Sequence, residues 1–288
     1  MTLTRKDILL KLARVENLPS PPRLLNNALS LIENPDSSVE EIAKIISQDA
    51  AISAKLISIS NSPFFRGATE VTELQTACVR LGLNELQNLL LASVLSGTFS
   101  VSSEETMNKF WLHSMACGYT TDVIFDMSVS SKNSPFKSMA FSSGLLHDLG
   151  SLVLMQQWPE EYNLLIETLI QGDTTIFNLE TEKWGVNHSE IGDLLSRRWK
   201  LPEVYRFIMR YHHEPWEAPE AYSELVKAVH LADFICSSQG FARVESMPIE
   251  FDSTSWDYFG LSEDDVPEIL DRVERTGEKS EHFSSLIK

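Results

Sequence analysis

The sequence predicts an all-α fold, and three observations carry this prediction. Apolar residues recur at three- and four-residue spacing through most of the chain, as on the buried face of amphipathic helices. Proline, glycine and asparagine interrupt these segments at intervals typical of helix ends. No run of alternating polar and apolar residues reaches the length of a strand. With 288 residues, the chain is long enough to bury the core of one large domain or two small ones.

The first part of the chain predicts a series of short helices. A short amphipathic helix is expected over residues 1–17, because the prolines in residues 19–22 cannot continue it. Ser38 with Glu41 makes a capping box for a later helix, and Asp49 can cap the next one. These helices are expected at residues 23–33, 39–46, 50–60, 71–81 and 84–97. The last is apolar nearly all round, which predicts a central position.

Further helices are expected from residue 103 onward. They lie at residues 103–125, 145–158 and 160–171, in a segment that Asn187 opens, and at 201–214, 221–238 and 262–273. Asn187 with Glu190 is a second capping signature. The stretch from Asp173 to Val186 is less periodic, and the final dozen residues are polar enough to fray. His147 and Asp148 lie inside an apolar segment that is interpreted as a buried helix.

Composition and charge exclude several classes of function. The formal net charge of −17 argues against binding nucleic acid through its phosphates and against docking on an anionic membrane. No apolar stretch is long enough to span a bilayer, and the N-terminus lacks the apolar core of a signal peptide. Cys78, Cys117 and Cys236 form no CxxC pair and are interpreted as reduced, buried thiols. We therefore expect a soluble, cytoplasmic protein.

Histidine and aspartate recur on the expected helices. A buried imidazole next to a buried carboxylate, as at His147 and Asp148, needs partners, and a metal ion is one such partner. Each residue alone is more often structural, as a hydrogen-bonded core histidine, a cation at a helix end or an ion-paired aspartate. Together they form a candidate metal-binding set: His113, His147, Asp148, His188, His212, His213 and Asp233. His230 and His282 are left outside this set.

The order of these residues resembles the HD superfamily of metal-dependent phosphohydrolases and, more narrowly, the HDOD family of bacterial signalling proteins. The segments that match the opening part of that family are residues 18–19, 47–49, 61–64 and 81–82. The segments that match its second half are residues 144–150, 199–202 and 212–215. The resemblance covers roughly residues 18–240, and its separated motifs occur in the family's order.

The resemblance implies an HD-type helical bundle with a helical N-terminal lobe. Its implied parts are an N-terminal lobe (1–105), a metal-binding bundle (106–240) and an acidic helical extension (241–288). It also implies one or two divalent ions of iron, manganese or zinc, which suit imidazole and carboxylate ligands. The first ion would be held by His113, His147, Asp148 and Asp233, and the second by His188, His212 and His213 with Asp148 bridging.

Two such ions would activate a water and hold a phosphoryl group, so Asp148 is also the catalytic candidate. However, the HD-GYP branch, which cleaves cyclic dinucleotides, carries a lysine where Ser151 stands and a DGxGYP run where residues 215–219 stand. A substrate phosphate would lack its expected cation here, although Arg197 or Arg210 could replace it.

We therefore expect a signal-transduction module, weakly active or inactive as an enzyme, that acts on a partner protein through its N-terminal lobe. One alternative is an active metal-dependent phosphohydrolase whose substrate is a nucleotide or another phosphorylated small molecule. A second is a buried polar network without metal.

Overall fold

The computed structural model describes residues 4–14, 18–62, 65, 67, 69–101, 103–171, 174–241 and 251–277. Helices and their connections make up this part of the chain, and it contains no strand. The all-α prediction is confirmed. Within the same ranges, no helix is both long enough and apolar enough to cross a membrane.

The chain divides into two compact units, and each is described by itself. The larger unit combines Met1–Ser20 with Phe99–Leu270, and the smaller combines Pro21–Thr98 with Asp271–Lys288. All seven candidate metal ligands belong to the larger unit. The three-part division expected from the sequence, with boundaries after residues 105 and 240, stays a prediction.

The smaller unit is built around one buried helix. Its helices are α2 (Leu25–Glu33), α3 (Val39–Ile46), α4 (Ala50–Ser60), α5 (Leu74–Leu81) and α6 (Leu83–Ser96). The capping box of Ser38 and Glu41 forms as expected, and Asp49 caps α4 by accepting two backbone N–H groups. The other four helices pack on α6, whose apolar surface explains its central place. Pro63 and Phe64 of the matched motif lie outside the described residues.

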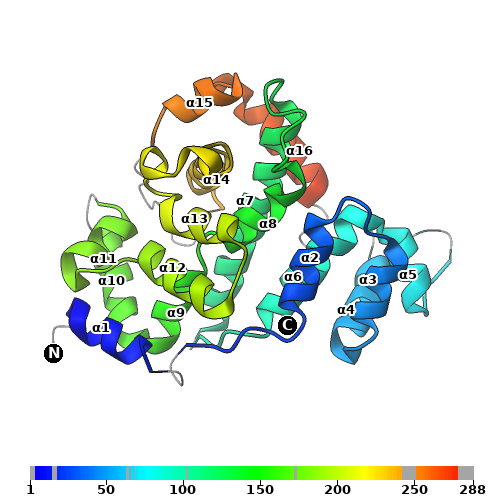
Figure 1. The fold of residues 1–288 in the computed structure, drawn as a ribbon, viewed down its shortest axis with the longest axis horizontal. Coiled ribbons are helices and arrows are strands. Elements are labelled where there is room, and N and C mark those ends of the chain that lie inside the picture. The colour runs from blue at the N-terminus through cyan, green and yellow to red at the C-terminus, as the bar shows by residue number, and fades with distance from the viewer. Residues whose placement is uncertain are drawn as a thin grey trace. The chain divides into compact units, whose positions relative to one another are not determined.

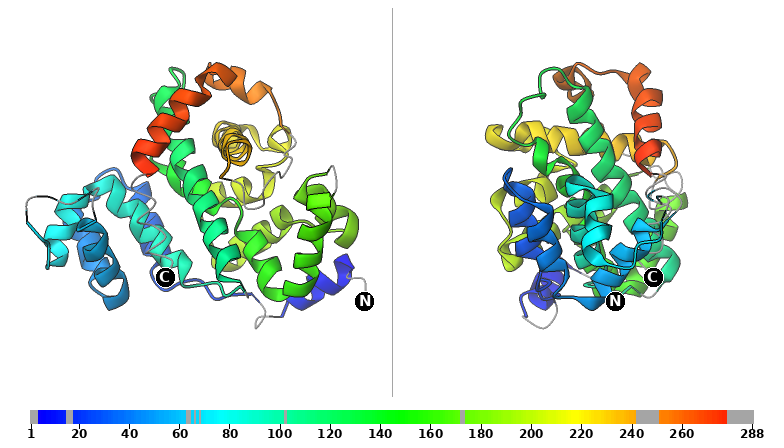
Figure 2. Two further views of the ribbon diagram at one scale, coloured as in Figure 1. Left: turned by 180° about the vertical axis from the view of Figure 1, so that it is seen from behind. Right: turned by 90° about the vertical axis from the view of Figure 1, so that its right-hand side faces the viewer.

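The larger unit contains most of the remaining helices (Figure 1). They are α1 (Arg5–Leu12), α7 (Glu104–Met127), α8 (Ala140–Leu146), α9 (Leu149–Gln157), α10 (Pro159–Gln171), α11 (Ile176–Trp184), α12 (His188–Trp199), α13 (Glu203–Tyr211), α14 (Glu220–Ser238) and α15 (Thr254–Phe259). The boundary between the units falls inside α16 (Val266–Gly277). Helices α7, α8 and α14 pack on one another, and α12 packs on α9 and α13 (Figure 2).

The segment with His147 and Asp148 differs from its prediction as one continuous helix. It is two helices, α8 and α9, which meet at this pair of residues. Asp148 leaves the helical conformation, with φ −111° and ψ 13°. Adjacent residues on an unbroken helix point about 100° apart, so the break gives the two side chains freedom to face one region.

The less periodic stretch before Asn187 also contains a helix, α11. Thr175 caps its first turn and Gly185, with φ 69°, ends it in the left-handed conformation. Ile176, Leu179 and Trp184 are buried, so tertiary packing stabilises a segment whose sequence periodicity is weak.

Two glycines allow backbones in the larger unit to touch. A Cβ atom on Gly150 of α9 would lie 1.9 Å from the carbonyl oxygen of His188 on α12. A Cβ atom on Gly144 of α8 would lie 2.5 Å from the carbonyl oxygen of Cys117 on α7. The absence of side chains at these two positions brings the helix ends that carry His147, Asp148 and His188 close together.

Candidate metal centre

The structure brings together all seven sequence-predicted site residues. Together with Cys117 they form three overlapping groups, in each of which the possible ligand atoms lie within 4.8 Å of one another. The α7 group is His113, Cys117, His147 and Asp233; the α12–α13 group is His188, His212 and His213; and the bridging group is His147, Asp148 and His212. His147 and His212 each belong to two groups, so the three groups make one continuous cluster.

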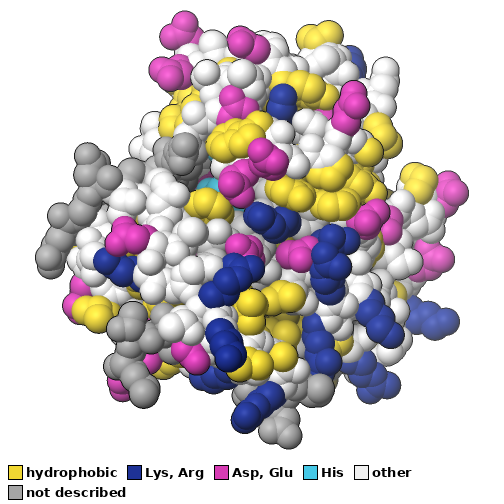
Figure 3. All heavy atoms as spheres, turned by 60° about the vertical axis from the view of Figure 1, so that its left-hand side comes forward, with side chains coloured by type: hydrophobic (Ala, Val, Ile, Leu, Met, Phe, Trp, Pro, Cys, Tyr) yellow, Lys and Arg dark blue, Asp and Glu magenta, His cyan; other side chains and the backbone are white. Residues whose placement is uncertain are grey.

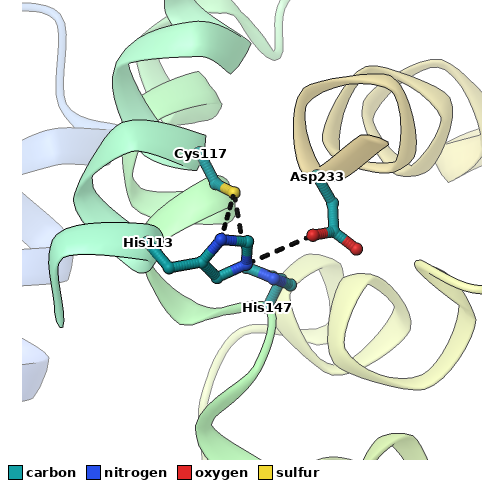
Figure 4. A group of neighbouring side chains, drawn as sticks. All are labelled: His113, Cys117, His147 and Asp233. Carbon is teal, nitrogen blue, oxygen red and sulfur yellow. Dashed lines mark hydrogen bonds and ion pairs between the residues drawn. The ribbon is translucent and has the colours of Figure 1, made fainter. Parts of the chain in front are cut away.

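The α7 group collects its side chains from two helices and the break after α8. His113 and Cys117 lie one turn apart on α7, His147 follows α8, and Asp233 extends from α14 (Figure 4). Nε2 of His113 lies 3.2 Å from Oδ1 of Asp233. All four side chains are buried, so their polar atoms have little access to water.

The α12–α13 group places two imidazole nitrogens face to face. Nε2 of His188, on the first residue of α12, lies 2.9 Å from Nε2 of His213, which follows α13. The same His188 nitrogen lies 3.4 Å from Oδ1 of Asp148. Asp148 therefore connects this group to the bridging group, and His212 completes the connection.

Hydrogen bonds determine which ring nitrogen faces the cluster. Nδ1 of His113 contacts the carbonyl oxygen of Phe241 at 2.9 Å, and Nδ1 of His147 contacts that of Gly144 at 2.6 Å. Nδ1 of His212 contacts the carbonyl oxygens of Ile208 and Met209 at 3.2 and 3.1 Å. A carbonyl oxygen only accepts, so each Nδ1 carries the hydrogen. In the neutral ring, Nε2 then presents a lone pair, as in a metal-bound histidine.

Several of these inward-facing nitrogens require a positive partner. Nε2 of His147 and Nε2 of His212 are buried and have no hydrogen-bond partner in the described part of the chain. Nε2 of His113 and Oδ1 of Asp233 each present a lone pair to the other. Their contact therefore needs a proton or a metal cation between them. A buried polar atom without a partner lowers the free energy of unfolding. One bound cation would interact with several of these atoms and remove this destabilisation. The residues present fit a divalent metal ion.

The electrostatic environment keeps the candidate ligands in a binding-competent state. Burial lowers the pKa of His147, and it lowers the pKa values of His212 and His213 well below their usual range, with neighbouring histidines adding to the effect. Burial alone would raise the pKa of Asp233, but the hydrogen bond and charge of His113 hold it well below its usual range. At neutral pH His147, His212 and His213 therefore offer neutral imidazoles, and Asp233 offers an ionised carboxylate.

Glu180 on α11 is a site residue that the sequence did not identify. Its buried carboxylate accepts the backbone N–H and the Nδ1–H of His188, both at 2.7 Å, and Tyr162 donates its hydroxyl to the other oxygen at 3.2 Å. Carboxylate partners of this kind orient metal-binding histidines. The weak periodicity of residues 173–186 concealed it, because nothing in that pattern marks Glu180 as buried.

Cys117 and His230 were also outside the predicted set. Cys117 lies four residues after His113, a spacing that places both on one face of a helix and could have suggested it. Burial raises the pKa of the Cys117 thiol well above its usual range, and Cys236 adds to this effect. His230 connects the cluster to a later segment, since Nδ1 contacts the carbonyl oxygen of His212 at 2.7 Å and Nε2 accepts the N–H of Asp252 at 2.9 Å.

The cluster is closed to solvent on most sides. Six of its seven predicted residues are at most 3% exposed, and only His213 is more exposed. On the face drawn in Figure 3, only a small area of histidine is visible, and basic side chains gather over the middle and lower part of the view. The arginines considered as phosphate ligands are engaged elsewhere: Arg197 pairs with Asp193 at 2.9 Å and Arg210 with Glu214 at 3.2 Å.

Comparison with known proteins gives one family and one curated relative. The model of the HDOD domain matches residues 18–215. An uncharacterised protein of Treponema pallidum (strain Nichols) is 31% identical over 220 residues, which are 76% of this chain and 42% of that protein. The chain therefore spans less than half the length of this relative.

Solved structures show the same fold at low sequence identity. An HDOD domain protein of unknown function from Geobacter sulfurreducens has a TM-score of 0.76 at 21% identity, covering 98% of this chain and 95% of that one. A candidate signal transduction protein from Marinobacter aquaeolei has a TM-score of 0.78 at 20% identity, covering 96% and 61%. A candidate phosphohydrolase from Shewanella amazonensis has a TM-score of 0.71 at 22% identity, covering 96% and 97%. The HDOD domain model covers more than half of the sequence, and on that ground the chain belongs to the HDOD family.

Proposed function

We propose that this protein is a signal-transduction module that binds one or two divalent metal ions and is weakly active or inactive as a phosphohydrolase. The observation that carries the proposal is a buried cluster of inward-facing histidine and aspartate side chains without a basic side chain at the place of Ser151. In this proposal, metal occupancy sets the state of the larger unit, and a partner protein senses that state through the N-terminal lobe, residues 1–105.

The donor set supports the metal-binding part of the proposal. His113, His147 and Asp233 would hold one ion, and His188, His212 and His213 a second, with Asp148 between them. Iron, manganese and zinc are the metals that imidazole and carboxylate ligands accept. Bound at this place, such ions would supply Lewis-acid polarisation of a phosphoryl oxygen.

The surroundings of Asp148 support the signalling part. Ser151 donates its hydroxyl to Oδ1 of Asp148 at 2.9 Å, at the position where the HD-GYP branch carries a lysine. A hydroxyl offers a phosphate one weak neutral donor, whereas a lysine would neutralise part of its charge. Arg197 and Arg210 pair with carboxylates on their own helices or next to them. The charge that stabilises a phosphoryl transition state is therefore missing from the places where the sequence suggested it.

An active metal-dependent phosphohydrolase is the second candidate, and the overlap of the three groups favours it. Two-metal hydrolases hold their ions close together with a shared carboxylate, and the bridging group offers that arrangement through Asp148. In this case the substrate is a nucleotide or another phosphoester, and Asp148 touches the reacting atoms.

Metal analysis and hydrolysis assays on the full chain separate the two candidates. We expect one to two equivalents of iron, manganese or zinc after purification without chelators, and no multiple-turnover hydrolysis of cyclic dinucleotides, nucleotides or phosphomonoesters. Robust turnover that is lost in Asp148→Asn and kept in Asp126→Asn would overturn the signalling proposal in favour of the enzyme. Asp126 is a suitable control because it pairs with Lys137 at the surface.

Cross-linking tests the role of the N-terminal lobe. The full chain is cross-linked in a lysate of its native host, once with metal and once with a chelator, and the linked peptides are identified by mass spectrometry. We expect one partner protein whose links to residues 1–105 change with metal. Links that are absent or insensitive to metal would contradict transmission through that lobe.

A further inference from the structure

We propose that Cys117 contributes a thiolate to the metal ion held by the α7 group and makes this position selective for zinc or ferrous iron over manganese and magnesium. The inference rests on the proposed metal-binding function. It adds a sulfur ligand to a set otherwise composed of imidazole and carboxylate.

Cys117 is placed for this role by the periodicity of α7. It lies four residues after His113, so the two side chains leave the same face of the helix one turn apart. Its side chain is fully buried, and Sγ lies 3.6 Å from Nε2 of His113. In Figure 4 the sulfur, the imidazoles of His113 and His147 and the carboxylate of Asp233 surround one small region.

The separations between these atoms agree with a four-coordinate metal site. For zinc, bond lengths of about 2.0–2.3 Å and tetrahedral angles place a nitrogen about 3.6 Å from a sulfur and about 3.4 Å from an oxygen. The observed separations from Nε2 of His113 are 3.6 Å to Sγ of Cys117 and 3.2 Å to Oδ1 of Asp233. Two imidazoles, one thiolate and one carboxylate supply as many ligand atoms as a tetrahedral site has.

A second, independent observation points to a ligand at the same place. Nε2 of His147 is buried, has no hydrogen-bond partner in the described chain and belongs to the α7 group together with Sγ. Its Nδ1–H is already used by the carbonyl oxygen of Gly144, so Nε2 is the lone pair available to the group. A cation within reach of both atoms satisfies this nitrogen and the thiol together.

Coordination requires one small movement and one deprotonation. The sulfur lies beside the ring of His113, at 3.9 Å from Nδ1 and 3.6 Å from Nε2, and must turn toward Nε2. The cysteine side chain turns about a single Cα–Cβ bond, so only one torsion changes. On binding, the S–H bond breaks, the sulfur lone pair forms the bond to the cation, and the proton passes to water.

A thiolate ligand changes which metals the site prefers. Soft sulfur ligands favour zinc and iron, whereas manganese and magnesium prefer oxygen ligands. Without Cys117 the α7 group offers only nitrogen and oxygen, and manganese binds such a set. With Cys117 the affinity for zinc rises while that for manganese does not.

The other cysteines provide matched controls. Sγ of Cys236 on α14 lies 3.3 Å from Oγ1 of Thr120 and belongs to none of the three groups found in the described residues. Cys78 is buried in α5 of the smaller unit. Cys78→Ser touches none of the proposed ligands, and Cys236→Ser replaces a thiol that hydrogen-bonds Cys117 but is not itself a proposed ligand.

Cobalt substitution tests the proposal directly. The full chain is stripped with a chelator, loaded with Co²⁺ and examined by absorption spectroscopy. Visible ligand-field bands report bound cobalt whatever its ligands, and a near-ultraviolet sulfur-to-cobalt charge-transfer band reports a thiolate ligand. We expect both signals in the natural protein, in Cys236→Ser and in Cys78→Ser, and the visible bands alone in Cys117→Ser.

The other possible spectra would refute the thiolate ligand, its assignment to Cys117, or metal binding itself. Visible bands without a charge-transfer band in the natural protein would refute the thiolate and leave the metal-binding function standing. A charge-transfer band that survives in Cys117→Ser, or that disappears in Cys236→Ser, would assign the sulfur ligand to another cysteine. No cobalt uptake by the natural protein would refute the metal-binding function itself. If Cys117→Ser fails to fold, the spectrum of the natural protein still tests both the thiolate ligand and the binding of metal.

Competition between metals gives a second readout. We expect Cys117→Ser to lose zinc affinity by more than the roughly tenfold cost of losing an outer hydrogen-bond partner, with little change in manganese affinity. An equal loss for both metals would indicate a packing defect and contradict selectivity through sulfur.

Discussion

At the scale of single residues, the candidate metal centre depends on groups outside the set of candidate ligands. Glu180 receives two N–H groups of His188 at 2.7 Å, and Tyr162 occupies its other oxygen. The carboxylate thereby fixes the position of the helix start and the orientation of the ring. Backbone carbonyls perform the same task for His113, His147 and His212. These supports decide which lone pairs face the cluster.

Glu180→Gln is expected to weaken metal binding about 10- to 100-fold, because the amide has only one accepting oxygen and cannot orient the imidazole equally well. Isothermal titration of the chelator-treated chain with Zn²⁺ or Mn²⁺ measures the change. Glu182→Gln, two residues along α11 in an exposed pair with Lys183, is the control and should bind metal normally. Equal affinities in the two variants would contradict the orienting role.

At the scale of helices, the site exists because helix ends and helix crossings coincide. The break between α8 and α9 directs both His147 and Asp148 toward one region. The close approach of α9 to α12 brings His188 beside these two residues. His212 directly follows Tyr211, the last residue of α13. Each ligand therefore sits at a helix terminus or at a crossing, where a small rotation of one element would move a ligand.

Gly150→Ala is expected to destabilise the protein by about 1–3 kcal/mol, as overpacking of a tight contact does. The added methyl group would meet the carbonyl oxygen of His188 on α12, and backbone atoms cannot move aside cheaply. Urea unfolding measures the free energy, and metal titration should show weaker binding because His188 is displaced.

Gly97→Ala is the matched control for this substitution. Nothing lies within 4 Å of a Cβ atom at Gly97, and its φ of −82° suits alanine. We expect no loss of stability there, and a gain of about 0.4–1 kcal/mol is compatible with lower chain entropy in the unfolded state. If both variants lose the same stability, the contact between α9 and α12 is not the cause.

At the scale of the whole molecule, the cluster connects the stability of the larger unit to its ligands and to pH. Seven ionisable side chains converge in its interior, although a core of this kind normally excludes them. Without metal they reduce the free energy of unfolding, since Nε2 of His147 and Nε2 of His212 lie buried without a hydrogen-bond partner in the described part of the chain. With metal the same groups become cross-links between α7, α12, α13 and α14.

Metal removal is expected to lower the melting temperature, because an ion that binds only the folded chain stabilises it by mass action. At a metal concentration about 100 times the dissociation constant, the gain is about 2.7 kcal/mol. Differential scanning calorimetry with chelator and with increasing zinc measures it. A melting temperature that does not depend on metal would contradict a site formed only in the folded state.

Acidification of the metal-free protein is expected to destabilise it below about pH 6.5, the usual pKa of histidine. Burial lowers the folded-state pKa values of His147, His212 and His213, so below that pH the unfolded chain binds more protons. The free energy of unfolding therefore falls as the pH falls, by up to about 1.4 kcal/mol for each unit of pKa difference.

Urea unfolding of the chelator-treated chain at about pH 7.5 and about pH 5.5 measures this change. Repeating it at high salt screens the surface charges and leaves the buried histidines little affected. A free energy that is equal at both pH values, or a difference that disappears in salt, would contradict the contribution of the buried imidazoles.

Patterns in the amino-acid sequence were enough to predict the all-α fold, which is confirmed, and to nominate the candidate ligands. Helical periodicity, the capping box at Ser38 and the cap at Asp49 are local properties, which operate between residues a few positions apart. The order of histidines and aspartates, together with separated motifs between residues 18 and 215, resembled the HDOD family, and the match of the domain model confirms that family. These features can be recognised in the sequence without knowledge of the tertiary packing.

The partners that complete the cluster became visible only in the packing of distant segments. Glu180 lies in a weakly periodic stretch, and its contact with His188 depends on the packing of α11 on α12. Cys117 faces His147 and Asp233 only because α8 and α14 pack against α7. The break at Asp148 lies two residues before Gly150, where the backbone of α9 approaches that of α12. A contact between distant segments depends on how their surfaces fit together in three dimensions. The periodicity of either segment alone does not reveal that fit.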